Sequence, residues 1–333
     1  MAATAATSAT SATSPGAVVV TGISGRLGRL LAQELHRRVP VVGIDRRPFA
    51  EAPKDVQMHR IDIRSRRCED VFRTNQIDAV FHLNIMHNPR RSAEEHHTFN
   101  VMGTQQVLEY CVHYKIPKLV VLSTANVYGP HPRNQMYLTE DAPLMAIERD
   151  VGVRDLVAMD MLVSAFFWQH PEIETTILRP VHICGSVHNA PSNYLRLPRI
   201  PKLLGFDPMV QVIHEMDVVK AMVATLEGTA RGVFNVTGPA AVPLSAVLSE
   251  LGKPVIEVPH LLFEPMVKYF YRARFWSFPY PELDYLKYGC VVDGSRIRKE
   301  LGFESERSIK EIVAMFRTPA AQGHVAVRGT GDQ

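Results

Sequence analysis

The chain has 333 residues, of which 46% are hydrophobic and 21% charged, with a formal net charge of +3 at pH 7. This length and apolar content suffice for a sizeable core in one large or two smaller domains. The near-balanced charge favours no particular partner, no basic stripe suits nucleic acid, and no apolar run reaches the ~18 residues that a membrane span requires.

Residues 1–16 are small, polar and uncharged. They lack the basic and apolar regions of a secretory signal, so we predict a disordered tail there. The cysteines Cys68, Cys111, Cys184 and Cys290 form no C-x-x-C pair, which predicts buried, reduced thiols in a cytoplasmic protein.

The first predicted strand, residues 17–21, leads into the glycine-rich segment Gly22-Ile23-Ser24-Gly25-Arg26-Leu27-Gly28, and an amphipathic helix is predicted at 26–38. A strand, a tight glycine turn and a helix start in this order are typical of dinucleotide binding. Residues without Cβ let backbone N–H groups approach a pyrophosphate, and the positive end of the helix faces it. The sequence therefore predicts a nucleotide site at this turn.

Strands and helices then alternate along the first half of the chain. We predict strands at 40–45, 56–60, 78–83, 118–123 and 174–179, and helices at 66–76, 93–114 and 153–170. This alternation is typical of an α/β protein with a parallel sheet and crossover helices. After about residue 180 prolines become frequent and the pattern is less regular.

From this change in pattern we predict three parts after the N-terminal tail. A doubly wound Rossmann domain covers 17–185, and a small mixed substrate lobe covers 186–320, interleaved with the end of the Rossmann domain. A flexible tail follows at 321–333.

Asp45 stands at the end of the second predicted strand. In dinucleotide folds an acidic residue there accepts hydrogen bonds from the adenosine ribose and repels a 2′-phosphate, which favours NAD. Arg46 and Arg47 follow directly, and because a guanidinium pairs with phosphate, NADP stays open as the alternative.

Taken together, the motifs of the first half resemble the extended short-chain dehydrogenase/reductases, especially the NAD-dependent epimerase/dehydratase family. The segments that carry the resemblance are Thr21-Gly22-x-x-Gly25-x-x-Gly28, Asp45, Asp62-Ile63, Val80-Phe81-His82-Leu83, Asn100-Val101-x-Gly103-Thr104, Ser123-Thr124-x-x-Val127-Tyr128-Gly129 and Leu178-Arg179-Pro180-Val181. They span about 17–185, with weaker echoes at 214–217 and 234–236.

The resemblance implies an NAD site at the ends of successive strands. The residues it assigns to the cofactor are Gly22, Gly25, Arg26, Leu27, Gly28, Asp45, Arg46, Asp62, Ile63, Leu83, Asn84, Ile85, Asn100, Ser123, Pro180 and Val181. Asn84 and Ile85 depart from the small residues usual in the family. The resemblance also implies that Thr124 bonds the substrate oxygen and that His182 lies in the substrate site.

The acid–base pair of this family, Tyr-x-x-x-Lys, is missing. In the family the lysine lowers the tyrosine pKa from about 10, so that a phenolate takes the proton. Aligning Asp160 with the family's acidic residue puts Gly152 and Leu156 at the tyrosine and lysine positions. Arg154 is a candidate substitute for the lysine cation, although an arginine cannot serve as the base near pH 7.

Two functions therefore stay open. One is an atypical oxidoreductase of a small-molecule substrate with a relocated base, for which Tyr128, Tyr137, His182 and Asp155 are candidates. The other is a catalytically degenerate NAD-binding regulator or scaffold with a regulatory protein partner.

The second half lacks the anion clamp of nucleotide-sugar enzymes. The resemblance places an arginine near residues 208–211, where this chain has none, so a UDP-sugar is disfavoured unless Arg196, Arg199 or Lys202 substitutes. Residues 258–280, rich in aromatic and basic side chains, are predicted to form a helix packed on the small lobe. An interfacial helix or a wall of a hydrophobic pocket is the alternative.

Two further expectations concern metals and assembly. His82, His87, His96 and His97 lack a neighbouring cysteine or acidic ligand set, so we predict no metal site. Relatives often dimerise through the helices that match 93–114 and 153–170, whose apolar residues make a homodimer an expectation, although core burial explains them as well.

Overall fold

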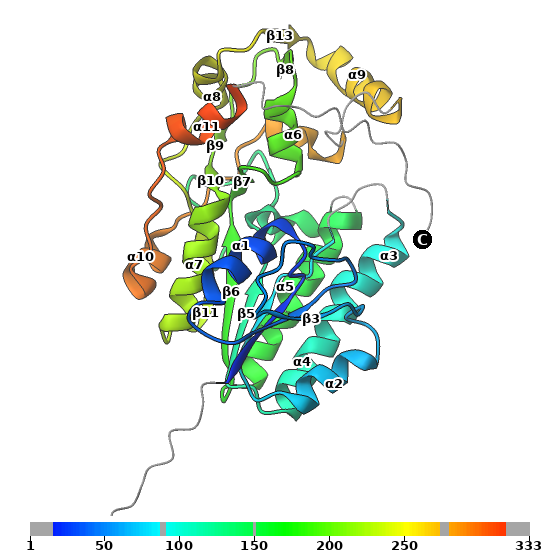
Figure 1. Cartoon of the computed structure of the whole chain (residues 1–333). Helices are drawn as coiled ribbons and strands as arrows, with labels where there is room; N and C mark the ends of the chain where they lie inside the picture. Colours follow the sequence, from blue (N-terminus) through cyan, green and yellow to red (C-terminus); the bar gives the residue numbers. More distant parts are fainter. Residues whose placement is uncertain (1–15, 87–90, 149–150, 274–279, 318–333) are drawn as a thin grey trace, which may run out of the picture.

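A seven-stranded parallel sheet forms the centre of the protein in a computed structural model that describes residues 16–86, 91–148, 151–273 and 280–317 (Figure 1). The strand order is β11-β6-β5-β4-β1-β2-β3. The strands are β1 (Ala17–Thr21), β2 (Val41–Ile44), β3 (Gln57–His59), β4 (Ile77–His82), β5 (Lys118–Leu122), β6 (Glu174–Pro180) and β11 (Gly232–Val236). All neighbouring pairs are parallel, which confirms the predicted doubly wound Rossmann fold. The predicted tails, apart from Gly16, lie outside the described residues.

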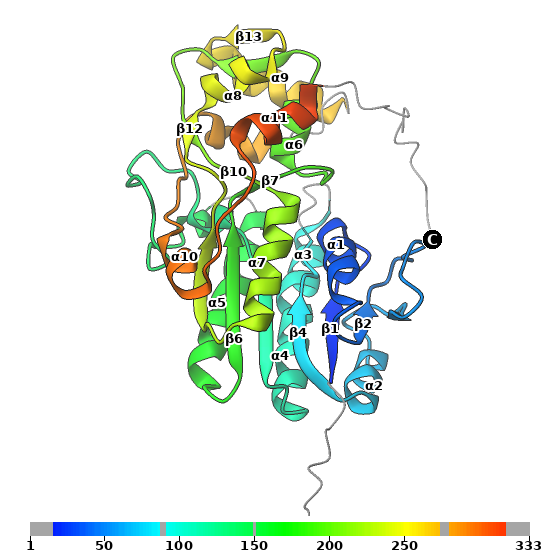
Figure 2. The same ribbon diagram turned by 60° about the vertical axis from the view of Figure 1, so that its left-hand side comes forward.

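Helices cover both faces of the sheet because side chains of a strand point alternately to opposite sides. Val18 and Val20 of β1 join a core with α1 (Arg26–Leu35) and α7 (Glu215–Glu227). Val19 joins the opposite core with α2 (Arg67–Thr74), α4 (Gly103–His113) and α5 (Val151–Gln169). Figure 2 shows α7 and α4 on the two sides of the sheet.

The single helix predicted over 93–114 is divided in the structure. It consists of α3 (Ala93–His97), a π-helical turn η1 (Thr98–Met102) and α4. The turn points Asn100 inward, where it is fully buried and bonds the backbone of Met86 with both ends of its amide, at 2.7 and 2.8 Å. The wider turn thus anchors the segment that follows β4.

A smaller lobe lies over the carboxyl ends of the central strands (Figures 1 and 2). Its strands pair as β7 (His182–Cys184) with β10 (Val212–His214), β8 (Ile200–Leu203) with β13 (Val255–Val258), and β9 (Met209–Val210) with β12 (Val242–Pro243). Its helices are α6 (Ala190–Arg196), α8 (Leu244–Leu251), α9 (His260–Arg272) and α11 (Ile309–Arg317), and α10 (Ser295–Leu301) packs beside β11. Short 3₁₀ turns are η2 (Ala125–Tyr128), η3 (Met145–Glu148) and η4 (Tyr280–Leu286). Because α7 and β11 return to the central sheet, the two parts are interleaved along the chain.

Helix α9 occupies most of the aromatic segment predicted over 258–280. It continues through Pro265, and residues 274–279 lie outside the described part. Phe263 and Val267 are buried, whereas Leu261 and Leu262 are exposed. None of the described helices is both long and apolar enough to cross a membrane.

Candidate functional site

The glycine turn after β1 makes room for a ligand at the start of α1. Gly22 has φ +75°, and a Cβ on it would lie 3.0 Å from the backbone of Asn84. A Cβ on Gly28 would lie 2.5 Å from the carbonyl oxygen of Gly22, so this close approach requires glycine. Gly25 is the N-cap, and within the fully described α1 no side chain caps the helix and no acid lies in its first turn. The N–H groups of Arg26, Leu27 and Gly28 therefore have no helical acceptor and suit an anion.

Asp45 lies beside this turn at the end of β2. Only 4% of the residue is exposed, and its carboxylate accepts hydrogen bonds from the Ser24 N–H at 3.1 Å and the Arg47 N–H at 2.9 Å. The Arg47 guanidinium also pairs with Asp45, at 3.3 Å. These bonds hold the carboxylate where an adenosine ribose is bound in dinucleotide folds.

Five of the residues that the resemblance assigned to the cofactor line a narrow cavity next to Asp45. Its lining consists of Ile44, Asp45, Arg46, Ile61, Asp62, Ile63, Asn84 and Phe99. Phe99, from the π-helical turn, was not predicted, and the guanidinium groups of Arg46 and Arg64 lie 5.4 and 5.6 Å from its ring centre. A flat apolar wall of this kind suits a planar heterocycle.

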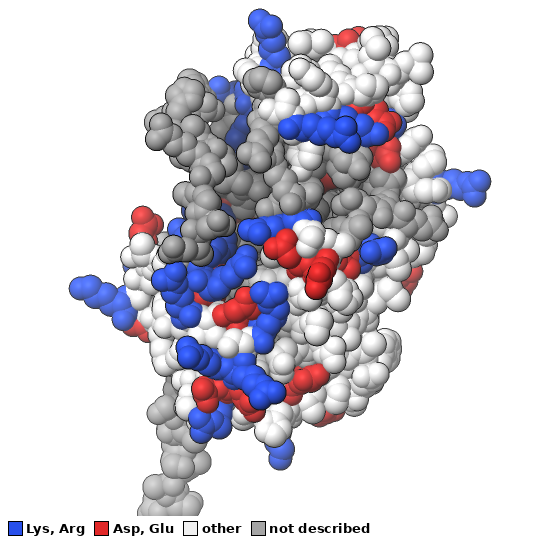
Figure 3. All heavy atoms as spheres, turned by 90° about the vertical axis from the view of Figure 1, so that its right-hand side faces the viewer, with Lys and Arg blue, Asp and Glu red and all other residues white. Residues whose placement is uncertain are grey.

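Charged side chains around the cavity next to Asp45 pair with one another. Hydrogen bonds from Arg64 lower the pKa of Asp62 against the opposing effect of burial, and the two side chains form an ion pair at 2.8 Å. On the face seen in Figure 3, Lys and Arg side chains lie next to Asp and Glu side chains. Arg46 is directed toward Phe99, and Arg47 is partly neutralised by Asp45.

Arg26 has a different environment from the one expected of a cofactor ligand. Its guanidinium forms an ion pair with Glu215 at 2.7 Å and lies 3.4 Å from the Ser186 hydroxyl. Glu215 begins α7 and also accepts the Ser186 N–H at 3.0 Å. The Arg26 side chain thus ties the glycine turn to the small lobe, and only its backbone N–H faces the anion position.

The remaining predicted cofactor residues line the same edge of the sheet. Leu83, Asn84 and Ile85 are half-buried after β4, and the Leu83 N–H donates to the Thr21 carbonyl at 3.1 Å. Val181, 5% exposed after β6, donates its N–H to the Val236 carbonyl at 3.1 Å. Pro180 is the last residue of β6. β1 and β4 are neighbours at the point where the strand order reverses, where ligands of such sheets bind.

Ser123 belongs to a buried polar network rather than to the open cleft. Its hydroxyl donates to Asp160 at 2.5 Å, and Asp160 forms a two-bond ion pair with Arg179 at 2.5 and 2.9 Å. Arg179 also donates to the Tyr128 hydroxyl at 2.8 Å. Asp160 and Ser123 are 0% and 4% exposed. This network fixes the ends of β5 and β6 relative to α5. Both oxygens of the Asp160 carboxylate accept hydrogen bonds within it.

Tyr128 is thereby removed from the candidates for a relocated base. It is fully buried, and its hydroxyl donates to Asn235 Oδ1 at 2.8 Å while accepting from Arg179. Burial raises its pKa to about 12, which outweighs the lowering by Arg179. A phenol in this state cannot collect a proton from a substrate near neutral pH.

Thr124 is the residue that the resemblance assigned to the substrate oxygen. It is half-buried after β5, and its Oγ1 accepts the Asn126 N–H at 3.2 Å, which leaves the hydroxyl proton for a donor role. The positions aligned with tyrosine and lysine lie on α5. Leu156 is 2% exposed in the core, and Arg154 is exposed.

The other candidate bases are spread over three places. Tyr137 is 49% exposed in a loop. Asp155 is buried on α5, with Oδ1 3.5 Å from His97 Nδ1 and Oδ2 without a hydrogen-bond partner among the described groups. His182 lies edge-on to Tyr285, with ring centres 5.3 Å apart, and burial lowers its pKa to about 4.

His182 also lines a pocket of the small lobe. The lining residues are His182, Pro191, Tyr194, Leu195, Val210, Val212, Leu244, Val247, Glu282, Tyr285 and Leu286. They come from β7, α6, β9, β10, α8 and η4. Most of them are aliphatic or aromatic. The hydrophobic pocket weighed for the substrate half therefore forms, but from α6, α8 and η4 rather than from α9.

Comparison with known proteins places this geometry in a family. An uncharacterised protein of Mycobacterium tuberculosis is 28% identical over 302 residues, which cover 86% of this chain and 79% of that protein. Short-chain dehydrogenase/reductase family 42E member 1 of Xenopus laevis is 27% identical over 231 residues, covering 63% and 58%. The structure of UDP-glucuronic acid 4-epimerase from Bacillus cereus in complex with UDP-glucuronic acid and NAD shares the fold. Its TM-score is 0.71 at 20% identity, over 90% of this chain and 98% of that one.

The family model described as NAD dependent epimerase/dehydratase matches residues 18–237. That range runs from the first strand and the glycine turn to the seventh strand of the central sheet. The predicted resemblance is confirmed: the chain belongs to the NAD-dependent epimerase/dehydratase family.

Proposed function

We propose that the chain binds NAD in the cleft at the carboxyl ends of β1 and β4 and acts as an oxidoreductase of the epimerase/dehydratase type. The observation that carries the proposal is the glycine turn, where a Cβ on Gly28 would strike backbone and the first turn of α1 lacks both a capping side chain and an acid. Asp45 and the residues around it supply an acceptor for ribose hydroxyls and apolar side chains for a base. The solved relative that shares this fold holds NAD.

Each part of the site has a task in this proposal. When bound, NAD supplies a hydride acceptor at the nicotinamide. The first-turn N–H groups of α1 hold the diphosphate, Asp45 accepts the ribose hydroxyls, and Pro180 and Val181 bound the nicotinamide end. Thr124 donates a hydrogen bond from its hydroxyl to the substrate oxygen and orients it. Because Leu156 replaces the lysine, the proton leaves by a route other than a Tyr–Lys pair.

The experiment has a binding arm and a turnover arm. Isothermal titration of NAD and NADP into the purified chain should show one site that prefers NAD. Incubation with NAD and a panel of secondary alcohols and UDP-glucose should then raise the near-ultraviolet absorbance of reduced nicotinamide or interconvert epimers. Absence of NAD binding would remove the whole proposal.

A second function, an NAD-dependent regulator, is favoured by one observation. The lysine position holds Leu156, which is 2% exposed and part of the core, so no small shift of α5 could bring a cation there. A regulator would bind NAD with no turnover of any substrate. It would also change its affinity for a protein partner when NAD is added.

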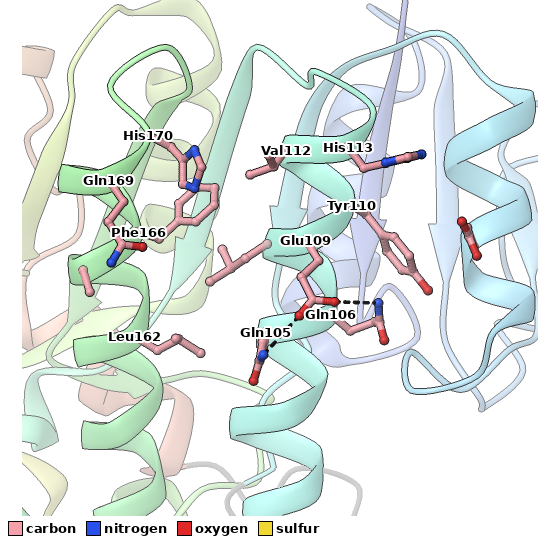
Figure 4. A pocket seen from close by; sticks show the side chains of 13 residues that line it. Gln105, Gln106, Glu109, Tyr110, Val112, His113, Leu162, Phe166, Gln169 and His170 are labelled. Atoms are coloured by element: carbon pink, nitrogen blue, oxygen red, sulfur yellow. Dashed lines mark hydrogen bonds between the residues drawn. The ribbon is translucent and has the colours of Figure 1, made fainter.

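We further propose that two copies pair through α4 and α5. A groove between these helices is lined by side chains of both, among them Leu108, Tyr110, Leu162 and Phe166 (Figure 4). Val112, which also lines the groove, is 39% exposed, and Met161 and Trp168 on α5 are 53% and 80% exposed. Exposed apolar side chains along a groove are typical of an interface between proteins.

Sedimentation analysis tests this pairing. The chain should sediment as a dimer, and Met161→Glu should shift it toward the monomer without lowering its thermal midpoint. The matched control is Leu261→Glu on α9, where the native side chain is 85% exposed, and it should leave the dimer intact. A monomeric unaltered chain would contradict the pairing.

A further inference from the structure

The pocket of the small lobe has the wrong chemistry for a nucleotide diphosphate. Seven of its lining residues are aliphatic: Pro191, Leu195, Val210, Val212, Leu244, Val247 and Leu286. Among the described residues that line it there is no lysine or arginine, and Glu282 is the one acid. A diphosphate would lose its water here without gaining a cation from these side chains.

The cations weighed as substitutes are engaged elsewhere. Arg196 donates to the carbonyl oxygens of Gly185 at 2.6 Å and Val187 at 3.0 Å, and its guanidinium lies 5.4 Å from the ring centre of Phe316. The Lys202 ammonium lies 3.8 Å from Asp207. Arg199 is exposed and does not line the pocket. The lack of an anion clamp noted in the sequence therefore extends to the described residues that line this pocket.

The pocket is joined to the catalytic edge of the sheet. His182 lines it and follows Pro180 by two residues, at the expected nicotinamide end. The Tyr285 hydroxyl donates to the carbonyl of Asn126 at 3.2 Å, two residues beyond Thr124. A molecule whose body fills the pocket would therefore direct one end toward Thr124.

We infer that this pocket holds the body of the substrate, and that the substrate is an uncharged, largely apolar cyclic alcohol or ketone rather than a nucleotide-activated sugar. The inference rests on the proposed function, because it names the substrate class of the same site. The His182 imidazole, whose pKa burial lowers to about 4, is neutral at pH 7 and suits a neutral ligand. His182 is one of the few polar residues that line the pocket and can orient a ligand there.

Calorimetry with defined probes tests the inference. The probes are trans-2-decalol, cyclohexanol and uridine diphosphate, each titrated into the chain with NAD present. Decalol should bind roughly ten- to 100-fold more tightly than cyclohexanol, because its four additional carbons are removed from water. Uridine diphosphate should give no binding. Equal or tighter binding of uridine diphosphate, or no binding of decalol, would overturn the inference.

Two variants at one position test the location. Val210 lines the pocket from the short strand β9 and is half-buried. Val210→Arg and Val210→Trp should each weaken decalol binding at least tenfold, the first by charge and the second by filling the space. The matched control, Leu204→Arg, changes a side chain that is 49% exposed in the same lobe and should leave decalol binding unchanged.

NAD titration of every variant distinguishes a failure of the substrate inference from a failure of the proposed function. If the variants and the unaltered chain bind NAD alike, the fold is intact, and unchanged decalol binding in both Val210 variants contradicts the inference alone. If the unaltered chain does not bind NAD, the proposed function fails first.

Discussion

Replacing Gly25 by alanine should weaken NAD binding far more than it weakens the fold. Gly25 has φ −70°, which alanine adopts without strain, and the added Cβ would lie 3.1 Å from the Gly22 carbonyl oxygen and 3.6 Å from Arg47 Nη2. The neighbours must yield by only a few tenths of an ångström, so the free energy of unfolding should fall by at most about 1 kcal/mol. The methyl group stands where the diphosphate approaches the N–H groups of α1. Losing one charge-assisted hydrogen bond of about 1.5–3 kcal/mol weakens binding roughly ten- to 100-fold.

The assay pairs calorimetric titration of NAD with urea unfolding of the same preparation. Gly205→Ala is the matched control, because Gly205 has φ +83° and open space around its Cβ position. That variant should lose about 1 kcal/mol of stability through backbone strain and keep its NAD affinity. If Gly25→Ala binds NAD like the unaltered chain, the diphosphate does not lie on the first turn of α1.

The remaining predictions concern Asp45, His82 and Tyr128. Asp45→Ser should weaken the binding of NAD at least tenfold relative to that of NADP in paired titrations, because the carboxylate no longer accepts the ribose hydroxyls or repels a 2′-phosphate. An unchanged ratio of the two affinities would place the adenosine elsewhere. Burial lowers the pKa of His82 to about 4 from 6.5, so between these values the unfolded chain binds a proton that the folded chain excludes, and stability rises with pH. The unaltered chain should lose about 2 kcal/mol more than His82→Gln between pH 7 and pH 5 in urea unfolding, and equal losses would refute this. Tyr128→Phe should lose about 1–3 kcal/mol of stability with unchanged NAD affinity and turnover, whereas turnover lost from a fully stable variant would identify Tyr128 as the base after all.

Much of the fold was predictable because residue type, hydrophobic pattern and turn residues all indicate the same alternation of strands and helices. The strands of the first half are β-branched runs that alternate with amphipathic helices, and the glycine spacing marks the turn that ends the first strand. The grouping of residues beside Asp45 was equally predictable, since residues assigned to the cofactor follow strands β2, β3 and β4 and line one cavity. Parallel strands bring such residues to one edge whatever their distance along the chain.

The parts that escaped prediction depend on tertiary contacts. The π-helical turn that carries Phe99 into the cavity beside Asp45 adds one residue to a helical turn, and hydrophobic periodicity does not detect this. Ser123 matched a cofactor motif, yet its hydroxyl bonds Asp160, which lies on α5. Arg26 matched the glycine loop, yet its side chain pairs with Glu215 on α7, far along the chain. Partners at such separations are fixed by the fold and leave no local pattern.

The apolar pocket was predictable only in part. The missing arginine in 208–211 was visible in the sequence, and it disfavoured a UDP-sugar. Which side chains replace the clamp was not visible, because α6, α8 and η4 supply them from distant segments.

The most direct test of the central claim is a crystal structure of the chain grown with saturating NAD. The account predicts the diphosphate on the N–H groups at the start of α1, a ribose on Asp45 and the adenine beside Phe99. An empty cleft at saturating NAD, or a dinucleotide bound away from the glycine turn, would contradict it.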